Sequence, residues 1–309
     1  MFVVKNVIDP TQATKKVAIF CSTNQEYIAL MSECDIRSYI IRHDQWPISL
    51  DQFSSNMRIV KTGDAVDSSI DCVICVGTAD NYDHAVAYSK KNCVPLVLIR
   101  QTGNNTHIIY PYSTKINRRE NIEADVIVDI IQPEESEATS DSMTVTIPPV
   151  EPKFEILAKR TYDNITVNAN IPKEVLIHYK SMLTGLNVQP HDRKSPSSSD
   201  IYIETWVGDV IMPLRCMAAG SIVMLPDSQE ARRIIDHEKN GFIYNDFQDM
   251  KENMIKILQR KVAGNLEEIS ENARKSAPKF FCSEEDFVSR WETIINLLCS
   301  TKSKLGNIL

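Results

Sequence analysis

The first half of the chain alternates short apolar runs with amphipathic stretches. The apolar runs are rich in valine and isoleucine and lie at residues 16–21, 38–41, 71–77, 95–99 and 124–128. A helical spacing of apolar positions follows the third run, over residues 81–91. Strands that are apolar on both faces and alternate with helices are typical of a parallel sheet covered on both sides. The pattern therefore predicts a Rossmann-like domain over residues 1–140.

The same alternation resumes after an acidic segment, residues 132–142, which lacks large apolar side chains and which we interpret as a linker. Strands are expected at residues 165–170, 200–203 and 221–225, with helices at 172–183 and 213–219. A polar gap at residues 191–199 has the composition of a mobile loop. These elements predict a second Rossmann-like domain over residues 141–282, so the expected fold class is α/β with two such domains.

Three further helices are predicted toward the end of the chain. Asp227 is expected to cap a helix with Glu230 as its reciprocal partner, and that helix should end at Asn240 and Gly241. Two amphipathic helices follow, the second of them in residues 283–309. Their methionine and aromatic stripes are typical of core packing, so we expect no site residues there.

Composition narrows the class of protein. A chain of 309 residues has room for two domains, and 43% hydrophobic with 24% charged residues argues against disorder, fibres and coiled coils. Only nine glycines leave few places for a glycine-rich phosphate loop. The eight cysteines are scattered, which favours free thiols in a reducing compartment. With no run of 18 apolar residues and no signal-peptide pattern, we expect no membrane span and a cytoplasmic location, the host cytoplasm if the protein is viral.

The acid excess is concentrated in one half. Residues 1–150 hold 13 basic and 19 acidic side chains, whereas residues 151–309 hold 21 and 22. Affinity for nucleic acid comes mainly from lysine and arginine on phosphates, so the net charge of −7 opposes a nucleic-acid partner, most of all for the first half.

A family resemblance is carried by residues 200–246. They read DIYIETWVGDVIMPLRCMAAGSIVMLP, then EARRIID and NGFI. This resembles the donor-binding domain of GT-B glycosyltransferases, most closely the large retaining family that includes sucrose and glycogen synthases. Residues 143–154 are similar to the start of that domain, and residues 280–298 to the closing helix that crosses back to the first domain. The resemblance implies two Rossmann-like domains facing across a cleft, with residues 1–140 binding the acceptor, 141–282 the donor, and 283–309 forming the closing helix.

The resemblance also implies a nucleotide-sugar donor, with a UDP-sugar expected first, whose diphosphate lies against the helix starting at Pro213. The family places two glutamates eight residues apart, and here Asp209 stands for the first and Arg215 for the second. Arginine cannot accept from ribose hydroxyls, but it can donate two parallel bonds to a phosphate.

Four further residues complete the expected donor site. Trp206 and Gly208 lie in the turn before the helix, and Lys173 follows the preceding strand. The family implies that Glu230 binds sugar hydroxyls. Two alternatives stay open: Lys173 as an exposed lysine, and Glu230 as no more than the capping partner of Asp227.

Catalytic and acceptor residues are expected from the first domain. Asp80 and His84 follow the strand that ends at Gly77 and, together with Asp209, are the candidates for catalysis. Being four apart, Asp80 and His84 could instead pair on a helix. Arg100 and His107 follow the next strand, where the family usually has a histidine, and are the acceptor candidates. Such enzymes stabilise the leaving diphosphate with helix N–H groups and cations, so no obligatory metal is expected.

These observations predict a nucleotide-sugar-dependent glycosyltransferase of undetermined acceptor, with retention of configuration implied by the family alone. One alternative is a viral-type enzyme that glycosylates modified bases in DNA, which the compact size and the patch of Lys115, Arg118 and Arg119 favour and the acidity opposes. The other is a catalytically inactive GT-B-like binding protein, favoured by the missing glutamate pair and histidine.

Overall fold

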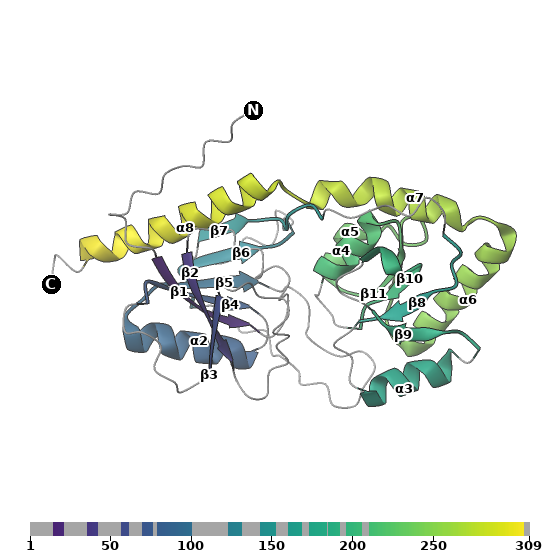
Figure 1. The fold of residues 1–309 in the computed structure, drawn as a ribbon, viewed down its shortest axis with the longest axis horizontal. Helices are drawn as coiled ribbons and strands as arrows, with labels where there is room; N and C mark the ends of the chain where they lie inside the picture. Colours follow the sequence, from purple (N-terminus) through teal and green to yellow (C-terminus); the bar gives the residue numbers. More distant parts are fainter. Residues whose placement is uncertain are drawn as a thin grey trace.

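The fold comes from a computed structural model. It describes residues 15–21, 36–42, 57–61, 70–76, 79–100, 123–131, 143–152, 160–168, 173–183, 185–191, 196–205 and 210–305. Two α/β domains lie side by side, each with its own sheet (Figure 1).

The first sheet has seven parallel strands. They are β1 (Lys15–Cys21), β2 (Ile36–Arg42), β3 (Met57–Lys61), β4 (Cys72–Val76), β5 (Leu96–Arg100), β6 (Val126–Asp129) and β7 (Met143–Thr146), in the order β3-β2-β1-β4-β5-β6-β7. The five expected strands are confirmed, and β3 and β7 are additional. The strand order reverses between β1 and β4, which is the switch point where ligands bind in doubly wound sheets.

Helices cover both faces of this sheet. Val17 and Ile19 of β1 belong to one buried cluster with Phe287 and Trp291 of α8 (Glu284–Leu305). The alternate residues of β1 pack instead beside α2 (Ala79–Asn92). Successive strand residues point to opposite faces, so a run that is buried throughout needs cover on both sides. The closing helix supplies one of these covers and runs along the first domain in Figure 1.

The first sheet extends further along the chain than expected. β7 pairs in parallel with β6, and Arg290 Nη1 of α8 donates to the Thr146 carbonyl at 2.9 Å. The expected boundary at residue 140 therefore falls between two strands of one sheet, and the acidic segment 132–142 connects these strands. A segment that is polar and poor in apolar residues is typical of any connection between two elements. Its composition does not distinguish a connection within a sheet from a domain boundary.

The second sheet has five parallel strands. They are β8 (Ile165–Val167), β9 (Val188–Pro190), β10 (Ile201–Ile203), β11 (Ile222–Pro226) and β12 (Phe242–Tyr244), in the order β12-β11-β10-β8-β9. The helices are α3 (Lys173–Met182), α4 (Ile211–Ala218), α5 (Gln229–Ile234), α6 (Phe247–Ala263) and α7 (Leu266–Ser276), with short 3-10 turns at Pro196–Ser198 and Ala277–Phe280. Here the switch point lies between β8 and β10.

Two local expectations in this domain, the cap and the end of α5, are wrong. Ser228, not Asp227, caps α5: its Oγ accepts from the Ala231 amide at 3.0 Å. The helix ends at Ile234, well before Gly241, because residues 235–240 turn toward β12. Gly241 is needed for close approach, since a Cβ there would lie 2.6 Å from Ile235 Cδ1. The ends of the gap at 191–199 are buried, with His191 and Ser199 inside the domain.

Within the described parts of the chain, no helix combines the length and apolarity needed to cross a bilayer.

Candidate functional site

Three helices begin at the carboxyl edge of the second sheet. α3 begins at Lys173 after β8, α4 at Ile211 after β10, and α5 at Gln229 after β11. Strands β8, β10 and β11 are neighbours, so the helix starts share one edge at the switch point. The structure thus brings the elements that carry Lys173, Arg215 and Glu230 together, as a donor site requires.

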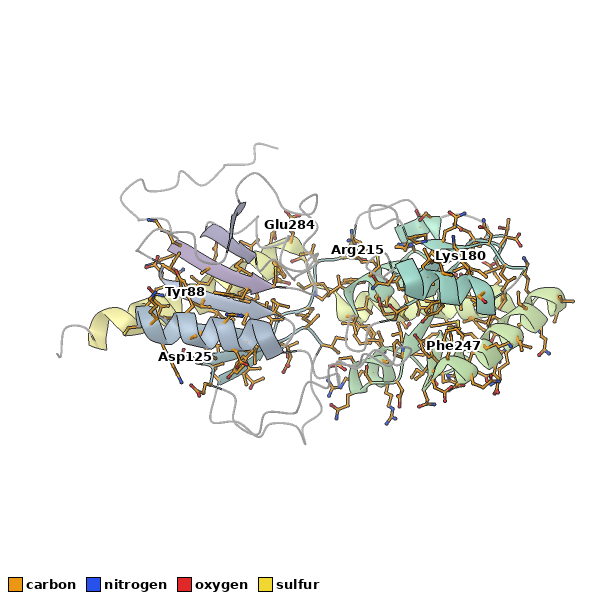
Figure 2. The ribbon with its side chains drawn as sticks, turned by 90° about the horizontal axis from the view of Figure 1, so that it is seen from below. Tyr88, Asp125, Lys180, Arg215, Phe247 and Glu284 are labelled. Carbon is orange, nitrogen blue, oxygen red and sulfur yellow. The ribbon has the colours of Figure 1, made fainter. Side chains whose placement is uncertain are left out.

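Arg215 is the best-defined cation at this edge. It is half-buried on α4 and lies on the side of the second domain nearest the first (Figure 2). Arg215 is the fifth residue of α4, and side chains of a helix tilt toward its N-terminus, which directs the guanidinium toward the start of the helix. Among the residues the structure describes, no acidic side chain forms an ion pair with it. A desolvated cation of this kind is suited to an anionic ligand.

The start of α4 adds backbone donors. The helix begins two residues before Pro213, and no side chain caps it at Val210. The amide of Leu214 is the first to bond within the helix, to the Val210 carbonyl at 3.0 Å. Pro213 has no N–H, which leaves the Ile211 and Met212 amides as the donors of the first turn. Partial positive charge and these amides complement Arg215.

Glu230 lies in the first turn of α5 and is 6% exposed. It cannot be the capping partner of Asp227, because Ser228 is the cap and Glu230 is only two residues beyond it. Asp227 instead accepts from Arg232 Nε at 2.7 Å on the surface. The capping alternative is therefore wrong, and a role in ligand binding stays a prediction.

Sequence reasoning missed a buried carboxylate at the same edge. Glu204 follows β10 directly and is fully buried. Its Oε1 accepts from Asn168 Nδ2 at 2.6 Å and from the Thr205 amide at 2.7 Å, and its Oε2 accepts from Asn168 Nδ2 at 2.8 Å and from the Tyr202 hydroxyl at 2.7 Å. Asn168 follows β8, so the contact joins the two strands that flank the switch point. The only sequence signal was an acid placed directly after a buried apolar strand.

The amino edge of the same sheet holds a different acid. Asp200 precedes β10 and forms a buried ion pair with Arg160 at 3.3 Å. It also accepts from the Thr161 hydroxyl and from the amides of Asp163 and Asn164, at 3.1–3.2 Å. Arg160 in turn donates to the Ser199 and Ala219 carbonyls. Burial lowers the pKa of Arg160, while the Asp200 charge opposes that shift.

A buried polar chain runs between these two edges. His191 Nδ1 lies 3.0 Å from Thr166 Oγ1, which donates to Ser199 Oγ at 2.7 Å. On its other side, His191 Nε2 lies 3.8 Å from Cys216 Sγ. Burial raises the pKa of the Cys216 thiol, with Arg215 lowering it and Glu204 raising it further. Burial therefore favours the protonated form of this thiol.

In the first domain, α2 starts directly after β4 at the switch point, so Asp80 lies in its first turn. His84 is exposed one turn later. Arg100 ends β5, the neighbour of β4, and thus shares this edge. The side chains of Asp80, Arg100 and Lys173 lie outside the described ones.

Several expected residues lie outside the described residues altogether. They are Lys115, Arg118, Arg119, His107, Trp206, Gly208 and Asp209. In the described part of the chain, no three His, Cys, Asp or Glu side chains are grouped so that they could hold a metal ion.

Comparison with solved structures gives the fold class. HepE from Anabaena, solved in complex with UDP and glucose, has a TM-score of 0.58 at 11% identity, over 92% of this chain and all of that one. Sucrose-phosphate synthase from Thermosynechococcus elongatus has a TM-score of 0.62 at 10% identity, over 93% of this chain and all of that one. The pneumococcal O-GlcNAc transferase GtfA, solved with UDP and GlcNAc, has a TM-score of 0.52 at 13% identity, over 74% of this chain and 57% of that one.

Neither a protein-family model nor a curated protein sequence matches the chain. At identities this low, the structural similarity shows the fold and not the activity. The chain has the two-domain α/β fold of GT-B glycosyltransferases, as the resemblance of residues 200–246 implied.

Proposed function

We propose that this protein is a nucleotide-sugar-dependent glycosyltransferase with its donor at the carboxyl edge of the second sheet. The GT-B fold and the switch point between β8 and β10 support this assignment. HepE, which has this fold, has been solved with UDP and with UDP-glucose, so a UDP-sugar is the first donor to test.

The observation that carries the proposal is that Arg215, at the carboxyl edge of the second sheet, pairs with no described acid. Its half-buried side chain forms no ion pair with an acidic side chain among the described residues, and the tilt of helix side chains directs it toward the start of α4. When the sugar is transferred, the bond between the sugar and the terminal phosphate oxygen breaks, and that phosphate gains a second negative charge. A fixed cation and backbone amides stabilise this charge as it develops, without having to reorganise. Arg215 and the start of α4 would perform this role.

The other site residues belong to the same proposal. Lys173, Trp206, Gly208, Asp209 and Glu230 would complete the donor site, with Asp209 close to the sugar. Asp80 and His84 of α2 would assist the acceptor hydroxyl.

Arg100 and His107 would bind the acceptor. Arg100 shares the carboxyl edge of the first sheet with the start of α2, as an acceptor site at the first switch point requires.

Release of nucleoside diphosphate tests the activity. The protein would be incubated with UDP-, GDP- and ADP-sugars, with and without EDTA, and the free diphosphate measured. We expect release from at least one donor, unchanged by EDTA because helix amides and Arg215 hold the diphosphate. Binding of a donor without release would indicate an inactive GT-B-like binding protein. No binding and no release with any donor would contradict the proposal.

The acceptor needs its own test. Nothing in the described residues favours DNA as the acceptor. We therefore expect no binding of duplex DNA to the protein. Affinity for duplex DNA that falls steeply with salt would point to a DNA acceptor.

A further inference from the structure

We propose that Glu204 is the positioning residue of the donor site: it fixes the two chain segments that leave β8 and β10 relative to each other. The inference rests on the proposed function and concerns a residue to which the resemblance assigned no role. Glu204 is fully buried at the switch point, where a donor would lie.

Glu204 cannot itself bind the donor. A carboxylate has about four acceptor positions, and each oxygen of Glu204 already accepts two hydrogen bonds. It also has no exposed surface.

Its partners are the first residues of the two segments. Asn168 is the last described residue before Lys173 and α3, and Thr205 is the last described residue before Trp206 and Asp209 in the sequence. One carboxylate binds the side chain of the first and the amide of the second, at 2.6–2.8 Å. It therefore sets the starting position of both expected donor-binding segments.

A third strand is tied to the same residue. The Tyr244 hydroxyl, at the end of β12, donates to the Glu204 carbonyl at 2.5 Å. Burial raises the pKa of Tyr244 well above its usual value, and the charge of Glu204 adds to this shift, so the hydroxyl keeps its proton. Glu204 thus connects β8, β10 and β12 at their carboxyl ends.

Packing alone does not require this carboxylate. Burying a charge is expensive, and well-packed apolar side chains often serve stability as well or better. The structure offers a matched control on the same strand. Asp200, at the amino end of β10, is 7% exposed and also accepts four hydrogen bonds, but it lies away from the donor edge.

The experiment compares Glu204→Gln with Asp200→Asn. Each variant replaces a buried acid by its amide, so both should unfold at lower temperature. We expect the calorimetric Kd for UDP to rise about tenfold or more in Glu204→Gln, because small misplacements of binding groups have effects of this size. In Asp200→Asn it should stay within about twofold, since ligands bind at the opposite edge of the sheet. The donor KM should follow the Kd, with kcat changing less.

A milder pair serves if either amide variant fails to fold. Tyr202→Phe removes one hydroxyl donor from Glu204, and Thr161→Val removes one from Asp200. Weaker UDP binding in Tyr202→Phe alone supports the inference.

If the wild-type protein binds UDP and both variants of a pair bind it with equal affinity, the inference about Glu204 is wrong, and the proposed function is unaffected. Wild-type protein that neither binds UDP nor releases a diphosphate from any donor overturns the proposed function and the inference together.

Discussion

A buried acid lies at each end of strand β10, and the two acids are stabilised in different ways. At the amino end, Asp200 pairs with Arg160, and the arginine also satisfies two backbone carbonyls. At the carboxyl end, Glu204 is held by an amide, a hydroxyl and a backbone N–H, while Arg215 of the next helix pairs with no acid among the described residues. The amino edge thus neutralises its charges internally, whereas the carboxyl edge has a cation that pairs with no described acid. Substitutions at the amino end of β10 should therefore change mainly the stability of the protein, and substitutions at the carboxyl end mainly its binding of ligand.

The largest expected effect is at the amino edge. Arg160→Ala leaves Asp200 buried without its cation and should lower the free energy of unfolding by about 3–5 kcal/mol. Chemical denaturation would measure this loss, and calorimetry should show UDP affinity unchanged in the folded variant. A loss below about 1 kcal/mol would mean that the Arg160–Asp200 pair is not the structural anchor of this edge.

A smaller effect, on binding, is expected at the carboxyl edge. Arg215→Ala removes the cation beside α4 and should raise the donor KM about tenfold or more, equivalent to roughly 1.4 kcal/mol of binding free energy. Steady-state kinetics would measure it. Arg232→Ala is the matched control, because Arg232 is a 68% exposed arginine on α5 that pairs with Asp227. Equal kinetics in the two variants would remove Arg215 from the site.

The smallest effect concerns the cap of α5. Ser228→Ala should lower the free energy of unfolding by about 1 kcal/mol, since Ser228 Oγ accepts from the Ala231 amide. Asp227→Ala should cost less, about 0.5 kcal/mol or below, because it breaks only an exposed ion pair. Thermal melts of both variants would rank them. The reverse order would restore Asp227 as the cap.

Most of the fold could be predicted from the sequence, because buried parallel strands read as continuous apolar runs. β1, β4, β5 and β11 are of this kind. β3 and β9 were not predicted: β3 is a five-residue strand with two basic residues, and β9 has three residues and ends in proline. β7 is also partly exposed, so its residues lack the signature of a buried strand.

The candidate site could be predicted only in part. Arg215 was named through the family resemblance, because it stands where the family has its second glutamate. Glu204 and Asn168 were missed because they lie 36 residues apart, and only the pairing of β8 with β10 brings them together. Polar side chains in a buried network take their roles from tertiary neighbours, which a local pattern does not contain. The cap of α5 was misplaced by one residue for a local reason, since Asp227 and Ser228 are both good capping residues.

The most direct test is a crystal structure of the protein with UDP bound. We expect the diphosphate at the carboxyl edge of the second sheet, between the ends of β8 and β10. Arg215 and the first-turn amides of α4 should lie within hydrogen-bonding distance of it. A nucleotide bound to the first domain, or a diphosphate out of reach of Arg215, would contradict this expectation.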